Sequence, residues 1–294
     1  MKYLILTLVA LLACVAVGIL LMNLLRRVTG RPKSLPARIV TALLCTLLAL
    51  AGVGAAYLGN YYHADQTALA ALDGDGTVAV SSVDGILRFD GPGEQTALLF
   101  MPGAKVEAKA YAPLMLAIAQ GGVDCFVVSP PANIAFLGEG KLGECQEANA
   151  YEHWILGGHS LGGVVASSYA SDHPQQVDGL VLLASYAPGP IDERIKVCSI
   201  YGTEDGVLNR ELYEEAKARL PQGSIEKLLQ GCNHAGFGSY GPQRGDGEAT
   251  ISAQEQQAQT AQAILELAAS LDQQPQDQQP LEQQPQDQQL PEQQ

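Results

Sequence analysis

The stretch HWILGGHSLGGVVASSYAS, residues 153–171, decides the fold. Its first part is the apolar run Trp154–Leu156, its middle is a glycine-rich turn around Ser160, and Leu161–Ser171 is rich in small and apolar residues. A short apolar run without polar alternation is typical of a strand that is buried on both faces. Residues 153–171 therefore predict a buried strand, a sharp turn and a helix in direct succession.

The same alternation of strand and helix continues on both sides of this stretch. Further apolar strands are predicted at Ala97–Phe100, Cys125–Val128, Gly179–Leu183 and Val197–Tyr201, and another strand is predicted near Ile225–Leu229. Helices are predicted at Glu107–Gln120, Asn209–Leu220 and Ile251–Leu271. Strands that alternate with helices form a parallel sheet covered on both faces, and Thr77–Ser81 with Ile86–Phe89 adds an antiparallel hairpin. We expect a doubly wound, mostly parallel α/β domain over residues 73–271.

The front of the chain has a different character. Tyr3–Leu25 and Ile39–Gly59 are uncharged runs of 23 and 21 residues, each long enough to cross a hydrocarbon layer of about 30 Å as a helix. Residues 26–38 between them carry five Lys or Arg, which by the positive-inside rule keeps them in the cytoplasm. We expect transmembrane helices at 1–25 and 39–59, a basic cytoplasmic loop, and both chain ends outside the cell membrane.

Two other interpretations of the first apolar run are weaker. A cleaved signal peptide has an apolar core of about 7–15 residues, whereas this run is longer and a second one follows it. Leu11–Cys14 resembles a lipoprotein box, but a lipidated Cys14 would leave the uncharged residues after it without a role. We interpret Cys14 and Cys45 as small apolar residues of the two helices.

Charge is divided between the two parts of the chain. Residues 1–58 hold six basic residues and no acidic one, so residues 59–294 hold 11 basic and 31 acidic residues. Nucleic-acid binding needs a surplus of Lys and Arg, which excludes a general nucleic-acid partner. Residues 60–72 read as a tether or short helix, and the repeating Gln, Pro and acidic residues of 272–294 predict a disordered tail.

The central turn, Gly158-His159-Ser160-Leu161-Gly162, carries the candidate nucleophile. Glycines two residues on either side of Ser160 leave room for a strained strand-to-helix turn. The turn has no Lys-Ser or Lys-Thr pair for a phosphate loop, and no acidic residue closes the next strand as a dinucleotide site requires. Ser160 is therefore the expected nucleophile rather than part of a nucleotide site.

A serine hydroxyl needs a base and an orienting acid to act as a nucleophile. The strand Val197–Tyr201 is followed by Gly202-Thr203-Glu204-Asp205, and the strand Ile225–Leu229 is followed by Gly231-Cys232-Asn233-His234. Each group stands at the carboxyl end of its strand, where ligands bind in such sheets. His234 is the expected base and Asp205 the expected acid, with the adjacent Glu204 as the alternative acid.

With these motifs, residues 73–271 resemble the α/β-hydrolase superfamily. The segment HAGFGSYGPQRGDG, residues 234–247, is similar to that of small lidless bacterial members near the dienelactone-hydrolase-like group. The resemblance implies Ser160 as nucleophile, Asp205 as acid and His234 as base, with no cofactor and no metal. Dienelactone hydrolases proper have a cysteine where this chain has Ser160, so their substrate does not carry over.

The resemblance also implies an oxyanion hole. One donor is the backbone N–H of Leu161, and the other is Ala104, in the loop after the third strand. Gly103 beside it lets the backbone approach substrate or serves as a plain turn residue. Lys105 points over the pocket or is a solvated loop residue, and His159 packs under the turn.

The short connection after Leu183 leaves only 11 residues before Ile195, too few for a helical cap. We therefore expect an open pocket on a membrane-anchored, multi-pass serine hydrolase whose catalytic domain is extracytoplasmic. It would act on a small-molecule or envelope ester-like substrate through an acyl-enzyme. Acyl transfer by the same triad and a non-catalytic, membrane-bound binding or scaffold module are the alternatives. A non-catalytic binding or scaffold module has no physical need for a serine, an aspartate and a histidine at the ends of three strands.

Overall fold

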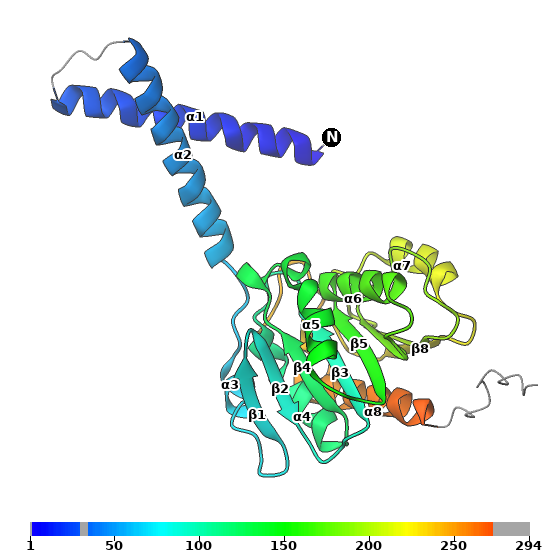
Figure 1. Cartoon of the computed structure of the whole chain (residues 1–294). Helices are drawn as coiled ribbons and strands as arrows, with labels where there is room; N and C mark the ends of the chain where they lie inside the picture. The colour runs from blue at the N-terminus through cyan, green and yellow to red at the C-terminus, as the bar shows by residue number, and fades with distance from the viewer. Residues whose placement is uncertain (1, 30–34, 273–294) are drawn as a thin grey trace, which may run out of the picture.

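The structure is a computed structural model that describes residues 2–29 and 35–272. The tail predicted at 272–294 lies, apart from Asp272, outside the described residues, as does the middle of the predicted basic loop. Figure 1 shows the helices α1 and α2 projecting from one end of a domain that contains all the strands.

An eight-stranded sheet forms the centre of the domain, in the order β1-β2-β4-β3-β5-β6-β7-β8. The strands are β1 Ala79–Val83, β2 Ile86–Asp90, β3 Thr96–Met101, β4 Asp124–Val128, β5 His153–His159, β6 Gly179–Leu183, β7 Lys196–Gly202 and β8 Ile225–Leu229. β2 pairs antiparallel with both β1 and β4, and all other neighbours are parallel. The predicted mostly parallel sheet with an antiparallel hairpin is confirmed.

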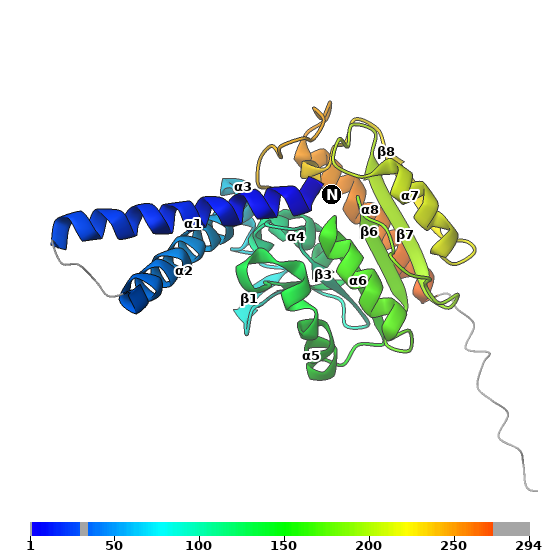
Figure 2. The same cartoon turned by 90° about the horizontal axis from the view of Figure 1, so that it is seen from above.

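Helices cover both faces of this sheet. They are α3 Gln66–Ala71, α4 Ala112–Gln120, α5 Gly140–Ala148, α6 Leu161–Asp172, α7 Arg210–Ala216 and α8 Ala253–Leu271. Short 3₁₀ turns are η1 Ala108–Tyr111, η2 Pro131–Asn133, η3 Ala135–Gly138, η4 Lys217–Arg219 and η5 Ala235–Phe237. Figure 2 shows α6 and α8 on opposite sides of β6. Residues 184–195, all of them described, contain no helix or strand, so no helical cap is inserted between β6 and β7.

Side-chain alternation along the central strands builds two cores. On β3, Leu98 and Phe100 point into the core shared with α4 and α8, while Leu99 and Met101 point into the core shared with α5 and α6. All four side chains are fully buried. Burial on both faces explains why this strand reads as a continuous apolar run. The carboxyl ends of the parallel strands lie at one edge, where the site described below is formed.

The two N-terminal helices are longer than the predicted spans. α1 is Lys2–Thr29 and α2 is Leu35–Gly59, so the helices continue through basic residues that we had assigned to the loop 26–38. Among the described residues, Ile39–Ala56 is long and apolar enough to cross a membrane, and Ala13–Leu24 is a shorter apolar helix.

The two helices pack against each other at a small residue. A Cβ added to Gly18 in α1 would lie 2.6 Å from the Oγ1 atom of Thr46 in α2. Glycine at this point lets the backbones approach closely, as in helix pairs within membranes.

Candidate active site

Ser160 lies at the sharp turn between β5 and α6. Its backbone angles are φ 53° and ψ −123°, a region in which a residue with a side chain is strained. Its amide donates to the carbonyl oxygen of Leu183 at 2.9 Å. Its carbonyl oxygen accepts a hydrogen bond from the Oγ atom of Ser185 at 2.7 Å. Contacts with the end of β6 therefore hold the strained turn in place.

The glycines around Ser160 allow this turn to form. A Cβ on Gly158 would lie 2.4 Å from the backbone of Gly162, and a Cβ on Gly162 would lie 2.1 Å from the carbonyl oxygen of Met101. Both distances are far inside the contact distance of about 3.5–4 Å between carbon atoms. The Gly-x-Ser-x-Gly spacing is thus required by close backbone approach, as the sequence predicted.

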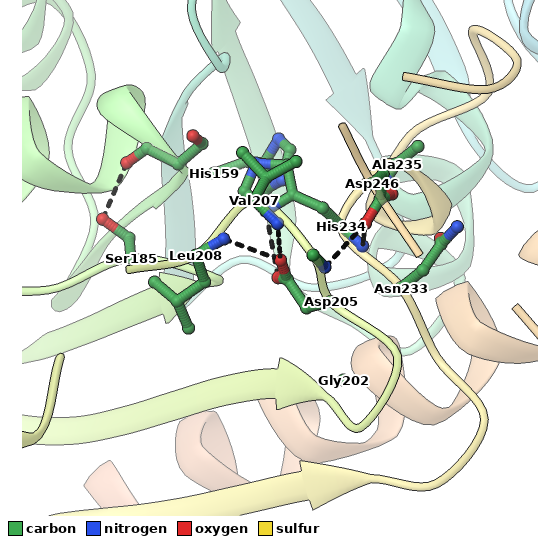
Figure 3. Close-up of polar contacts among 12 residues, drawn as sticks. His159, Ser185, Gly202, Asp205, Val207, Leu208, Asn233, His234, Ala235 and Asp246 are labelled. Carbon is green, nitrogen blue, oxygen red and sulfur yellow. Dashed lines mark hydrogen bonds and ion pairs between the residues drawn. The ribbon is translucent and has the colours of Figure 1, made fainter. Parts of the chain in front are cut away.

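Asp205 and His234 form a buried pair beside this turn. The Oδ2 atom of Asp205 lies 3.0 Å from the Nδ1 atom of His234 (Figure 3). The other carboxylate oxygen accepts hydrogen bonds from the amides of Val207 and Leu208, at 2.9 and 2.8 Å. Burial alone would raise the pKa of Asp205, but these hydrogen bonds and the charge of His234 outweigh it and lower the pKa from 3.8. The carboxylate is therefore ionised at neutral pH and orients the imidazole.

The second ring nitrogen of His234 is buried without a partner. Its Nε2 atom has no hydrogen-bond partner among the described residues, and the whole residue is 1% exposed. The hydrogen bond to the Ser160 hydroxyl that a triad uses is thus not formed here, and such bonds often tighten only when substrate binds. The ring centroid of His234 lies 4.4 Å from that of His159, the residue that precedes Ser160.

Asp246, which was not expected as a site residue from the sequence, anchors the loop that carries His234. Its carboxylate accepts hydrogen bonds from the amides of His234 and Ala235, at 3.1 and 2.8 Å, and from the amide of Gly206, at 3.1 Å. One side chain therefore joins the loop that carries His234 to the loop that carries Asp205 (Figure 3). The available signal was a lone Asp in the glycine-rich turn 241–247.

The loop that carries the predicted oxyanion donor is fixed by a buried tyrosine. The amide of Gly103 donates to the Oη atom of Tyr111 at 3.0 Å, and this Oη atom lies 2.8 Å from the Nδ1 atom of His159. Burial raises the pKa of Tyr111, so its hydroxyl stays protonated. Because the Gly103 amide is occupied, the exposed Ala104 remains the candidate donor in this loop, and the other candidate, Leu161, is the first residue of α6.

The other three candidate residues named from the sequence lie in different surroundings. His159 is fully buried, and burial, followed by the charge of His234, lowers its pKa well below 6.5. Glu204 accepts a hydrogen bond from Thr203 instead of contacting His234. Lys105 is half-buried in the loop after β3, with φ 59°.

Among the described residues, this site has neither a reactive thiolate nor a cluster of metal ligands. Burial raises the pKa of the Cys232 thiol to about 11, so it is not a thiolate at neutral pH. Within the described part of the chain, no group of three or more His, Cys, Asp or Glu side chains is arranged to hold a metal ion.

Comparison with known proteins places the chain in a family. The sequence profile described as the alpha/beta hydrolase family matches residues 97–258, more than half of the chain. Ser160, Asp205 and His234 all lie in that range. No curated protein matches the chain.

Solved structures share the same fold. MGS-MChE2, an alpha/beta hydrolase enzyme from the metagenome of sediments from the lagoon of Mar Chica, Morocco, is 18% identical with a TM-score of 0.51, over 66% of this chain and 99% of that one. VrEH2 is 10% identical with a TM-score of 0.51, over 67% of this chain and 100% of that one. The profile match and the sheet, taken together, show that the chain belongs to the alpha/beta hydrolase family.

Proposed function

We propose that the protein is a serine hydrolase that cleaves a carboxylic ester or a related acyl compound through an acyl-enzyme on Ser160. One observation carries this proposal: His234 is held by Asp205 at Nδ1, while its buried Nε2 has no partner among the described residues. A buried polar atom without a partner is costly. This cost has a function if Nε2 takes the proton of the Ser160 hydroxyl.

The proposed reaction uses the triad in two steps. The Oγ atom of Ser160 attacks the carbonyl carbon while Nε2 of His234 takes the hydroxyl proton, and Asp205 stabilises the imidazolium. The bond to the leaving alcohol breaks, and His234 returns the proton to that alcohol. Water then attacks the acyl-enzyme with the same base, releasing the carboxylic acid and restoring Ser160.

Backbone amides would stabilise the negative charge that develops on the substrate oxygen. The amide of Leu161 lies at the N-terminus of α6, where the helix dipole favours negative charge. The amide of Ala104 supplies the second donor from the loop after β3. Losing one such donor costs roughly 10²–10³ in rate in comparable sites.

We propose that the catalytic domain is anchored in the cell membrane on its extracytoplasmic side. Support comes from the apolar window Ile39–Ala56 in α2 and from the packing of α1 against α2 at Gly18. The basic residues between the two apolar runs would remain in the cytoplasm. Protease added to intact cells should then digest the domain, whereas protection until lysis would reverse this orientation.

Turnover by the full-length protein tests the enzymatic proposal. Membranes that contain the wild type should hydrolyse at least one member of a panel of short and long acyl esters, amides and lactones. Ser160→Ala should abolish that turnover, with circular dichroism confirming that the variant is folded. A folded wild type that cleaves no member of the panel would favour a binding or scaffold module.

A further inference from the structure

The segment after α2 is hydrogen-bonded to the loops at the carboxyl edge of the sheet and is not a free tether. The amide of Tyr62 donates to the carbonyl oxygen of Lys105 at 2.7 Å, and the amide of Glu107 donates to the carbonyl oxygen of Tyr62 at 3.0 Å. Tyr62 thereby forms a parallel bridge with Val106. The chain that leaves α2 is thus paired with the loop that carries the candidate oxyanion donor Ala104.

The same segment also holds the loop that carries His234. The amide of Asp65 donates to the carbonyl oxygen of Ser239 at 2.9 Å, and the amide of Arg244 donates to the Oη atom of Tyr62 at 3.2 Å. The rings of Tyr62 and Tyr240 lie 5.4 Å apart between centroids. Residues 62–65 therefore contact both loops that flank Ser160.

This pairing sets a short distance between the membrane helix and the site. Only three residue steps separate Gly59, the last residue of α2, from Tyr62, and a chain of that length spans at most about 11 Å. The helical residues from Ala56, where the apolar window ends, to Gly59 add about 5 Å. The headgroup layer on one side of a bilayer is roughly 5–8 Å thick. The loop at Lys105 must lie at the membrane surface if α2 spans the bilayer.

The next loop at this edge also lies against the membrane helix. α2 contacts η2, which follows β4, and the amide of Lys105 donates to the carbonyl oxygen of Asn133 in η2 at 2.9 Å. Figure 1 shows the end of α2 beside the domain, from where the chain continues to α3 and β1. The helix therefore meets the domain at the carboxyl edge of the sheet.

An exposed apolar pair lies at the same edge. Phe136 and Leu137 in η3 are 54% and 60% exposed, although large apolar side chains gain free energy by leaving water. Their neighbours fix them to the domain, because Ala135 is buried and a Cβ on Gly138 would lie 2.8 Å from the Cβ of Pro130. The pair is well placed to enter the outer part of a bilayer that contains α2.

We infer that the site takes esters that are themselves embedded in the membrane: amphiphiles whose acyl tail stays in the bilayer while the ester bond lies at headgroup level. This inference rests on the proposed hydrolase function and on the proposed membrane anchor. Residues 184–195 contain no helical cap that would cover Ser160 against such a substrate. Attack by Ser160 would break the ester bond, release the alcohol, and leave the acyl group to be transferred to water.

Lengthening the linker tests this inference. Full-length protein in phosphatidylcholine vesicles is given two fluorogenic esters with the same reporter alcohol, one short-chain and water-soluble, the other long-chain and bilayer-resident. The variant carries a Gly/Ser insert of about 20 residues between Gly59 and Asn60, with a root-mean-square length of roughly 25 Å. Turnover of the bilayer ester should fall by about tenfold or more because the site is no longer held at the surface. Turnover of the soluble ester should not change.

A paired surface variant gives an independent measurement. Phe136→Ser combined with Leu137→Ser should slow the bilayer ester several-fold and leave the soluble ester unchanged. The matched control, Ile225→Ser with Leu228→Ser, removes two exposed apolar side chains from β8 at the other end of the sheet. This control should leave both rates unchanged. If the insert also slows turnover of the soluble ester, the inference is tested by comparing the Phe136 and Leu137 double variant with the Ile225 and Leu228 control.

The outcomes separate the inference from the proposed function. Cleavage of the soluble ester but not the bilayer ester by the wild type would overturn the inference and leave the hydrolase proposal intact. Bilayer-ester turnover that is unaffected by both the insert and the Phe136–Leu137 pair would overturn it as well. A wild type that cleaves neither ester and is not labelled by a fluorophosphonate would end the proposed function itself.

Discussion

The carboxylate of Asp246 accepts a hydrogen bond from the backbone amide of His234 at 3.1 Å. The same carboxylate accepts from the amide of Gly206, next to Asp205. The geometry of the Asp205–His234 pair therefore depends on a second carboxylate, which binds the backbone of the two loops. Asp246 acts on the site by positioning the two loops and not by taking part in proton transfer.

Asp246→Ala should destabilise the protein and slow turnover together. Hydrogen bonds to a charged group contribute roughly 1.5–3 kcal/mol each, and Asp246 is half-exposed, so water replaces part of them. We expect a loss of about 2 kcal/mol in the free energy of unfolding and a lower kcat. Urea denaturation and ester turnover measure the two effects. Asp246→Asn, which keeps one acceptor oxygen, should recover part of both, and a variant with unchanged kcat would contradict the positioning role.

Asp205→Ala should lower kcat by roughly 10³–10⁴, less than Ser160→Ala or His234→Ala, because the acid only orients and stabilises the imidazole. Glu204→Ala is the matched control, since Glu204 contacts Thr203 and not His234. Its kcat should stay within about twofold of the wild type. If Asp205→Ala retains full activity while Glu204→Ala does not, the acid role belongs to Glu204.

Tyr111→Phe should loosen the loop that carries Ala104. The substitution keeps the ring in the core but removes the hydroxyl, which leaves the buried amide of Gly103 without its acceptor and His159 without its partner. An unsatisfied buried group costs about 1–3 kcal/mol. We expect that loss in urea denaturation, with kcat falling more than KM changes. A variant that loses stability but keeps kcat would show that the hydroxyl serves the fold alone.

The buried His159 should make stability depend on pH. In the unfolded chain its imidazole binds a proton below about pH 6.5, whereas burial lowers the pKa in the folded protein well below that value. Stability from this group is therefore present above pH 6.5 and is lost as the pH falls towards the lowered pKa, by at most about 2 kcal/mol at pH 5.

Urea denaturation of the detergent-solubilised protein at pH 7 and pH 5 measures this dependence. The wild type should lose more stability between the two pH values than His159→Asn, which has no titrating group at that position. Other titrating groups are the same in both proteins and contribute equally. An equal loss in both proteins would mean that His159 is not the neutral, buried group that the structure describes.

Local sequence patterns were sufficient to predict the sheet and the nucleophile turn. The interior of each central parallel strand is a nearly continuous apolar run, because burial on both faces disfavours polar residues there. The parallel edge strand β8 is only partly buried and also carries Glu226 and Lys227. Ser160 could be identified because glycines stand two residues before and two residues after it, where the strained turn needs close backbone approach. The order of Ser160, Asp205 and His234 along the chain then indicated which strand ends meet.

Features that depend on contacts distant in sequence were not predicted. Asp246 was missed because its partners are backbone amides, which leave no mark on residue types. The pairing of Tyr62 with the loop after β3 was missed for the same reason, since its partner Lys105 is 43 residues away. The helix α5, Gly140–Ala148, holds two glycines, which disfavour a helix locally. Burial of Leu142 and Cys145 holds it against the sheet.

Mass spectrometry of the protein after reaction with a fluorophosphonate probe tests the central claim most directly. The proposed triad predicts a covalent adduct on the peptide that contains Ser160, and no adduct in folded Ser160→Ala. A folded wild type that stays unmodified, or an adduct that persists in Ser160→Ala, would contradict the assignment of Ser160 as the nucleophile.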